Sequence, residues 1–280
     1  LDNKHIYIVG ESGSGKTVLL KNLAYEFRST EMKDGTNPRV IMTDVQGDLL
    51  QLMMSEIMSP IERKGWQSRI PEPDDVENAL ENMGPFQLII PVSKESDQTR
   101  LAAISKVVKD HGHTVSRVGL RLRDIDNVQE IEYLLRLSSE QAPLLLDDEV
   151  EAMKNENDTV SIDKLKSRLK RLANADADRK DKQLLSSASN PYYKSTFTAA
   201  QRGLRALEDI FDIHEESNQT HKDPLDCLKF DGTSIFYLED LGDEEKLMWG
   251  MQLVKWLYKN KRESGQFFVF IDEAHQLVPA

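Results

Sequence analysis

A run of eight residues near the amino terminus has the composition and spacing of a phosphate-binding loop. Residues 10–17 read Gly-Glu-Ser-Gly-Ser-Gly-Lys-Thr, which fits the pattern G-x-x-x-x-G-K-[ST] in full. Glycines let the backbone curl so that successive N–H groups point at phosphate oxygens, and a following helix adds partial positive charge. A glycine-rich turn without a ligand is the alternative, but the complete pattern makes it the weaker one. We predict that the nucleotide-binding residues are Gly10, Ser12, Gly13, Ser14, Gly15, Lys16 and Thr17.

Four side chains would carry the chemistry at such a loop. Lys16 reaches the β- and γ-phosphates, and the Thr17 hydroxyl ligates Mg²⁺. Asp272 and Glu273 directly follow an apolar run, and ligands of open α/β sheets bind at the carboxyl ends of the strands. We predict that Asp272 holds Mg²⁺, that Glu273 is the general base, and that Lys16 shares in catalysis. A strand that ends in Asp-Glu is common, so this assignment depends on the phosphate loop with which it is paired.

Hydrophobic patterns predict the elements that would position these residues. Short apolar, β-branched runs are typical of buried strands, and apolar residues at helical spacing indicate helices between them. The expected strands cover residues 5–9, 39–43, 86–92, 233–238 and 266–271, and the clearest expected helices cover residues 17–28 and 244–262. This alternation of strands and helices predicts an α/β fold with a parallel sheet flanked by helices.

The middle of the chain is mostly helical in pattern. Apart from a possible short strand within residues 115–122, strong strand signals are missing between residues 98 and 213. The helical patterns there cover residues 128–137, 141–153, 162–172 and 198–213. We therefore expect a first part of the core at 1–97, a large helical insertion at 98–225 and a second part of the core at 226–280. We also expect the rest of the core to follow residue 280.

Composition narrows the classes of protein that fit. The 36 basic and 48 acidic residues give a net charge of −12, which argues against a broad basic surface for nucleic acid, although not against a local patch. No apolar run approaches the ~20 residues that a membrane helix needs. Cys227 is the single cysteine, so an internal disulfide is impossible and a reducing, cytoplasmic location fits.

Three segments together resemble the HerA-type ATPases, which belong to the HerA/FtsK branch of ring-forming DNA motors. They are residues 5–17, 40–48 and 271–279. The middle segment is similar to that family's acidic-x-x-Gly-acidic turn after the second strand. The last segment reads Ile-Asp-Glu-Ala-His-Gln-Leu-Val-Pro and is similar to the family's ending after its acidic strand. The first segment is generic to P-loop proteins, so the other two carry most of the resemblance.

The resemblance implies a RecA-like P-loop NTPase that uses ATP and Mg²⁺. It further implies a hexameric homo-oligomer that acts as a helicase or translocase on double-stranded DNA, often with a partner nuclease and with no membrane attachment. In such rings a polar sensor and an arginine that completes a neighbour's site would come from beyond residue 280. Two other classes stay open: an ATP-dependent switch or assembly module, and a module that remodels proteins. DNA-stimulated turnover would distinguish a DNA motor from a switch.

Three further sets of residues allow two interpretations each. Asp44 and Asp48 either position Mg²⁺ or water beside the phosphate loop or belong to a good turn sequence; we keep Asp44 among the nucleotide-binding candidates. His275 is either a relay between the bound ATP and DNA or a histidine with a packing or capping role. Two basic clusters either touch phosphates or form solvated faces, and we favour the solvated interpretation. These clusters are Lys164, Lys166, Arg168, Lys170 and Arg171, and Arg117, Arg121 and Arg123.

Overall fold

The computed structural model divides into two compact units, which we call the sheet unit and the helical unit. The sheet unit comprises Leu1–Pro91, Ser96–Val118 and Lys222–Ala280, and the helical unit comprises Val92–Glu95 and Gly119–His221. The structure describes residues 8, 11, 13–32, 34–54, 64, 76–93, 96–120, 122, 128, 141–156, 160–177, 192–208, 224–260 and 267–277. Each unit is described by itself.

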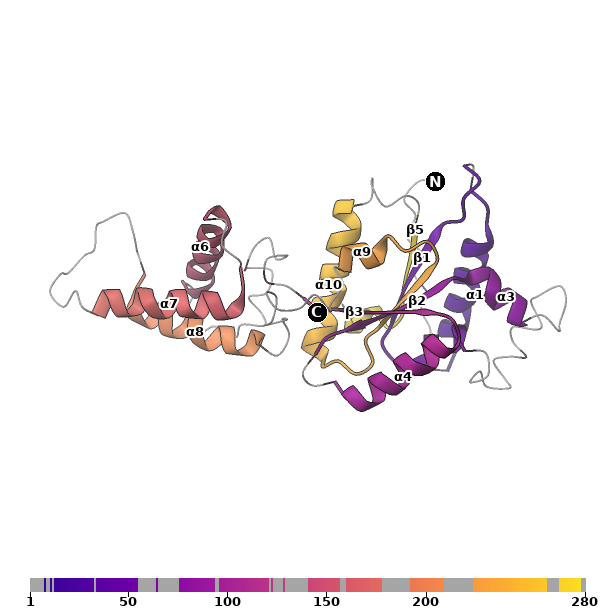
Figure 1. Cartoon of the computed structure of the whole chain (residues 1–280), viewed down its shortest axis with the longest axis horizontal. Helices are drawn as coiled ribbons and strands as arrows, with labels where there is room; N and C mark the ends of the chain where they lie inside the picture. The colour runs from indigo at the N-terminus through magenta and orange to yellow at the C-terminus, as the bar shows by residue number, and fades with distance from the viewer. Residues whose placement is uncertain are drawn as a thin grey trace. The chain divides into compact units, whose positions relative to one another are not determined.

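Five parallel strands form the sheet (Figure 1). They are β1 (Arg39–Asp44), β2 (Phe86–Pro91), β3 (Thr114–Val118), β4 (Thr233–Tyr237) and β5 (Phe267–Ile271), in the order β3-β2-β4-β1-β5. Every pairing is parallel, so the carboxyl ends of all five strands meet at one edge. The predicted parallel α/β fold is therefore confirmed. The strand expected at residues 5–9 lies outside the described residues, apart from Ile8.

Helices cover both faces of the sheet. One face packs against α1 (Lys16–Ser29), α3 (Val76–Met83) and α4 (Gln98–Asp110), together with the 3₁₀ turn η1 (Asp48–Leu52). Figure 1 shows α9 (Pro224–Leu228) and α10 (Asp243–Asn260) on the opposite side, and η5 (Ala274–Gln276) follows β5. Because side chains alternate across a strand, Phe236 of β4 points away from its neighbours Ile235 and Tyr237 and meets Trp249 of α10 at 6.5 Å between ring centroids.

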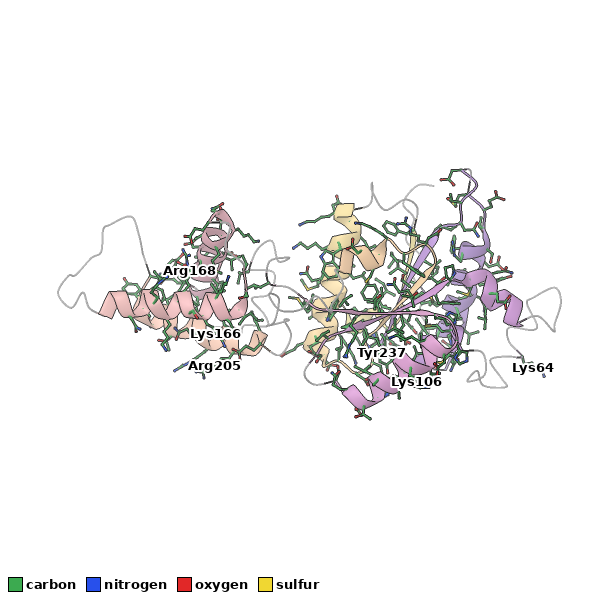
Figure 2. The ribbon with its side chains drawn as sticks, viewed as in Figure 1. Lys64, Lys106, Lys166, Arg168, Arg205 and Tyr237 are labelled. Atoms are coloured by element: carbon green, nitrogen blue, oxygen red, sulfur yellow. The ribbon has the colours of Figure 1, made fainter. Side chains whose placement is uncertain are left out.

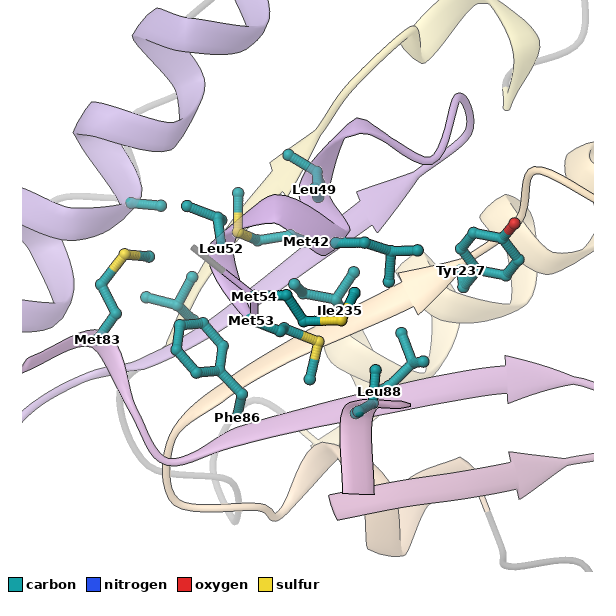
Figure 3. Packing of buried hydrophobic residues seen from close by; sticks show 14 of the residues in the cluster. Met42, Leu49, Leu52, Met53, Met54, Met83, Phe86, Leu88, Ile235 and Tyr237 are labelled. Atoms are coloured by element: carbon teal, nitrogen blue, oxygen red, sulfur yellow. The ribbon is translucent and has the colours of Figure 1, made fainter. Parts of the chain in front are cut away.

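The core beneath α1, α3 and α4 is rich in methionine (Figure 3). Met42, Met53 and Met83 are all buried, and the flexible thioether chain suits the irregular gap between a sheet, three helices and the short η1 turn. Leu49 and Leu52 of η1 add the apolar contacts that fix this turn beside the sheet edge. The core thus extends to the turn that directly follows β1.

The helical unit contains α6 (Ala142–Asn155), α7 (Ile162–Ala177) and α8 (Lys194–Leu207), which pack on one another. Leu146 of α6, Leu165 of α7 and Leu204 of α8 are all buried, as expected for a small bundle. By their contacts, α4 and β3 belong to the sheet unit, although they fall within residues 98–225. The predicted domain boundaries stay a prediction, and the helix expected at 128–137 lies outside the described residues, apart from Val128.

Candidate nucleotide site

The phosphate loop leads directly into α1. Gly13 and Gly15 have φ values of +78° and +84°, a backbone conformation that favours glycine, and Gly15 caps the first turn of the helix. A Cβ at either position would meet nothing within 4 Å, so the glycines serve the backbone conformation and the loop stays open on that side. The first free N–H groups of α1 therefore lie where an anion would bind. Gly10 and Ser12 lie outside the described residues.

The Lys16 side chain stays close to its own loop. Its Nζ donates a hydrogen bond to the Glu11 carbonyl oxygen at 3.0 Å, and the side chain is half-buried. The ammonium group is thus held at the loop that the sequence predicts to bind phosphates. A lysine at this position is a compact point charge that can exchange one oxygen partner for another.

A hydrogen bond connects the start of α1 to the end of β5. The Thr17 hydroxyl donates to Asp272 Oδ2 at 3.0 Å, although 255 positions separate the two residues. Asp272 is the first residue after β5 and is buried. A hydroxyl and a carboxylate oxygen side by side are hard oxygen donors of the kind that Mg²⁺ prefers. The two residues that the sequence predicts as Mg²⁺ ligands are therefore brought together, and their chemistry fits the ion.

Glu273 has a strained backbone. Its φ and ψ of 49° and 47° are left-handed, and no other non-glycine residue in the described ranges has a positive φ. The Glu273 N–H donates to Asp272 Oδ1 at 3.0 Å, and its Oε2 lies 3.2 Å from Nδ1 of the exposed His275. Such a conformation costs on the order of 1–3 kcal/mol and persists only where the surroundings enforce it, often at functional sites.

Asp44 ends β1, beside β5. The β1–β5 register pairs Thr43 with Ile271, so Asp44 and Asp272 follow at the same edge of the sheet. Asp44 is 2% exposed, and its two carboxylate oxygens accept hydrogen bonds from the N–H groups of Gly47 at 2.8 Å and Leu49 at 3.0 Å. These bonds favour the turn interpretation, and nucleotide binding by Asp44 stays a prediction.

Burial controls the ionisation of Asp44. Burial raises the pKa of the Asp44 carboxyl to about 7, against the lowering effect of the two backbone hydrogen bonds. The nearby charge of Asp48 also raises this pKa, and that of Lys21 lowers it. Asp44 is therefore a carboxyl group that titrates close to neutral pH.

Two groups of residues at this edge were not predicted. Lys21 of α1 is buried, and its Nζ donates to Gln51 Oε1 at 3.0 Å. Beyond β4, Glu239 Oε2 accepts from the Tyr237 hydroxyl and from Arg100 Nη2, both at 2.6 Å. Burial acts to raise the pKa of Glu239, but these hydrogen bonds leave the pKa below its ordinary value. Glu239 repeats the pattern of a strand followed by an acidic pair, which is the signal that could have found it.

A loop that opens α1 and a strand-end carboxylate bonded to the first hydroxyl of that helix define the class of P-loop NTPases. The chain belongs to one family within this class, described as the central domain of helicase HerA, whose model matches residues 1–246. This membership supports an ATP-binding P-loop ATPase of the HerA/FtsK class. The match ends before β5, so the roles of Asp272 and Glu273 depend on the sequence pattern and the geometry.

The other comparisons add no relative: no curated protein and no solved structure matches the chain. None of the helices in the described part of the chain combines the length and the apolar character that crossing a lipid bilayer requires.

Proposed function

We propose that this chain is the ATP-hydrolysing motor domain of a helicase or translocase that acts on double-stranded DNA as a homo-hexameric ring. The observation that supports this best is the hydrogen bond between Thr17 and Asp272, because it joins the phosphate loop to the acidic strand end in a chain of the HerA family. Simple phosphate binding would not require this pairing, whereas hydrolysis of Mg-ATP does.

Each residue has a separate task in this proposal. The loop N–H groups and Lys16 bind the β- and γ-phosphates, and the Thr17 hydroxyl and the Asp272 carboxylate hold Mg²⁺. The ion, when bound, neutralises charge on the phosphate oxygens. Glu273 accepts the proton of the attacking water at its carboxylate, while its left-handed backbone fixes where that carboxylate lies. His275, at 3.2 Å from Glu273 Oε2, orients this carboxylate.

Family membership supports the proposed assembly and partners. A neighbouring subunit would supply an arginine to the site, so an isolated subunit should turn over slowly. A nuclease partner is part of the proposal, as is a reducing cytoplasm, where the buried thiol of Cys227, which is in no disulfide, would stay reduced. The alternative function is an ATP-dependent switch or protein-remodelling module without DNA translocation; the overall charge of −12 is the observation that favours it.

The test is Mg-ATP hydrolysis by the full-length protein with and without double-stranded DNA. We expect DNA to stimulate turnover, and we expect Glu273→Gln to keep ATP binding while turnover falls by roughly 10²–10⁴-fold, the usual contribution of a general base. Turnover that is indifferent to DNA would favour the switch or the remodelling module. Normal turnover by the Gln variant would show that Glu273 is not the base.

A further inference from the structure

The basic residues of α7 fall into two classes by their partners. Arg168 faces α6, where its guanidinium bonds to Glu149 and Glu156, and Lys166 forms an ion pair with Glu208 at the end of α8. These two cations are partly covered and have carboxylate partners within the helical unit. Lys170 differs, because it is exposed and forms no hydrogen bond or ion pair with any described residue. In the second predicted cluster, Arg121 and Arg123 lie outside the described residues.

The Lys166–Glu208 ion pair indicates the relative direction of α7 and α8. Lys166 lies near the start of α7 and Glu208 directly follows the end of α8, so the two helices are antiparallel where they pack. Residues three or four positions apart lie on the same face of a helix. Lys170 is therefore the next residue beyond Lys166 along this side of α7, and Arg205 is the next beyond Glu208 on α8.

Three exposed cations continue from this ion pair along the two helices: Lys170 on the side of α7 that carries Lys166, Arg205 three positions from Glu208, and Arg202 three positions from Arg205. We call these three residues the cationic seam. Figure 2 shows Lys166 and Arg205 along the α7–α8 pair, with Arg168 on the side of α7 toward α6. The apolar side chains Leu169 and Leu204, which neighbour Lys170 and Arg205 in the sequence, are buried.

The cationic seam has no carboxylate partner in the described part of the chain. Arg202, Arg205 and Lys170 are all exposed, and Glu208, which lies three positions from Arg205, is already paired with Lys166. A row of three cations without carboxylate partners stands out in a chain whose net charge is −12. Cations held in a row on two packed helices match the regular negative charge of a nucleic acid backbone, and arginine binds phosphate with a planar fork of donors.

We propose that the cationic seam of the helical unit contacts the phosphate backbone of duplex DNA. The inference rests on the proposed function and adds to it a surface, outside the nucleotide site, through which the motor holds its substrate. The contacts are to phosphates and so are independent of base sequence. The seam contributes to affinity and to its salt dependence, and no base preference is expected from it.

The test measures duplex affinity against salt concentration in the full-length protein. A 30-bp duplex of arbitrary sequence is titrated with wild type and with the triple variant Lys170→Gln, Arg202→Gln, Arg205→Gln. Each lost phosphate contact lowers the slope of log K against log[salt] by about 0.9, so the triple variant should lose about 2.7 units of slope. A matched control, Lys106→Gln, Lys109→Gln, Lys229→Gln, removes three exposed lysines of the sheet unit and should keep the wild-type slope.

Further variants separate charge from folding. The double variant Arg202→Lys, Arg205→Lys keeps the charge and should keep the slope. If the triple variant does not fold, Arg202→Gln is measured in its place and should lower the slope by about 0.9 units. A folded triple variant with the wild-type slope overturns the seam and leaves the proposed motor function intact. A loss of slope in the control equal to that in the triple variant also overturns it. Wild-type protein that does not bind duplex DNA overturns the seam together with the DNA substrate of the proposed function.

Discussion

Glu273 is the proposed general base, and its backbone has an unfavourable left-handed conformation. A left-handed conformation places Cβ close to the following carbonyl oxygen, and only glycine adopts it without this penalty. The structure accepts the cost at the residue that follows Asp272, where the chain leaves β5 and enters η5. Strained residues persist where the surrounding structure enforces them, often at functional sites. This is the expectation for a general base whose carboxylate must be held next to the attacking water.

A comparison of two variants measures this strain. Glu273→Gly and Glu273→Ala both remove the carboxylate and its contact with His275, but only glycine releases the left-handed penalty. We expect Glu273→Gly to have a free energy of unfolding that is higher by roughly 0.5–1 kcal/mol, measured by urea denaturation. Equal stability of the two variants would mean that the backbone at residue 273 is not left-handed in solution. Neither variant should hydrolyse ATP at the wild-type rate.

Asp44 gives the fold a pH dependence with a definite sign. Its pKa is about 7 in the native state, against an ordinary value of 3.8. Between these values the native state holds a proton that the unfolded chain has released, so stability falls as pH rises. The contribution is present in full below pH 3.8 and is lost as pH rises through about 7. Over this range the loss is on the order of 4 kcal/mol.

The matched variant for this effect is Asp44→Asn, which cannot ionise. We expect the difference in unfolding free energy between wild type and Asp44→Asn to change from pH 5 to about pH 7, to the disadvantage of wild type, and to level off above that pH. Urea denaturation at each pH provides the measurement. Using the difference removes the contributions of other groups, such as His113, whose pKa burial lowers. A difference that does not vary with pH would show that Asp44 is ionised throughout.

At the scale of elements, the turn after β1 is fixed from two sides. Asp44 accepts hydrogen bonds from its N–H groups, and Gly47 packs directly against the Glu239 carboxylate that follows β4. Gly47 has a φ of +81°, and a Cβ there would lie 2.3 Å from Glu239 Oε2. The position therefore requires glycine both for the backbone and for the close approach.

Gly112 provides the control for Gly47, because its φ is +80° and a Cβ there would meet nothing within 4 Å. Gly112→Ala should cost about 1 kcal/mol, the left-handed penalty alone. We expect Gly47→Ala to cost at least about 1 kcal/mol more, since Glu239 must move away from Arg100 and Tyr237. Thermal or urea unfolding measures both. Equal costs, or full additivity with Glu239→Ala, would contradict the contact between residues 47 and 239.

The sequence was most informative where a chemical pattern coincided with a strand end. The strands at 39–43, 86–92, 233–238 and 266–271 were predicted within one or two residues, since buried parallel strands are short apolar runs. The proximity of Thr17 and Asp272 followed from the phosphate-loop pattern. Lys21 could not be predicted, because its burial depends on Gln51 from η1, a 3₁₀ turn with no periodic signal. The short α3 was also missed, and β3 was foreseen only as a possible strand.

At the scale of the whole molecule, the two units divide the described chemistry between them. The sheet unit contains the described residues of the nucleotide site, and the helical unit contains the cationic seam. The helical unit interrupts the sheet unit along the chain, between β3 and α9. If both proposals hold, ATP is hydrolysed in one compact unit while part of the DNA is held by the other.

The Glu239 carboxylate has a mechanical consequence for the sheet unit. It accepts hydrogen bonds from the Tyr237 hydroxyl and the Arg100 guanidinium, and it packs against Gly47. Arg100 belongs to α4 and holds Asp240 with its other terminal nitrogen at 2.8 Å. A displacement of the 44–49 turn would therefore disturb the Glu239 carboxylate and its ion pair with Arg100 of α4. A continuous series of contacts along the carboxyl edge thus connects the turn after β1, the strand beside β5, to α4.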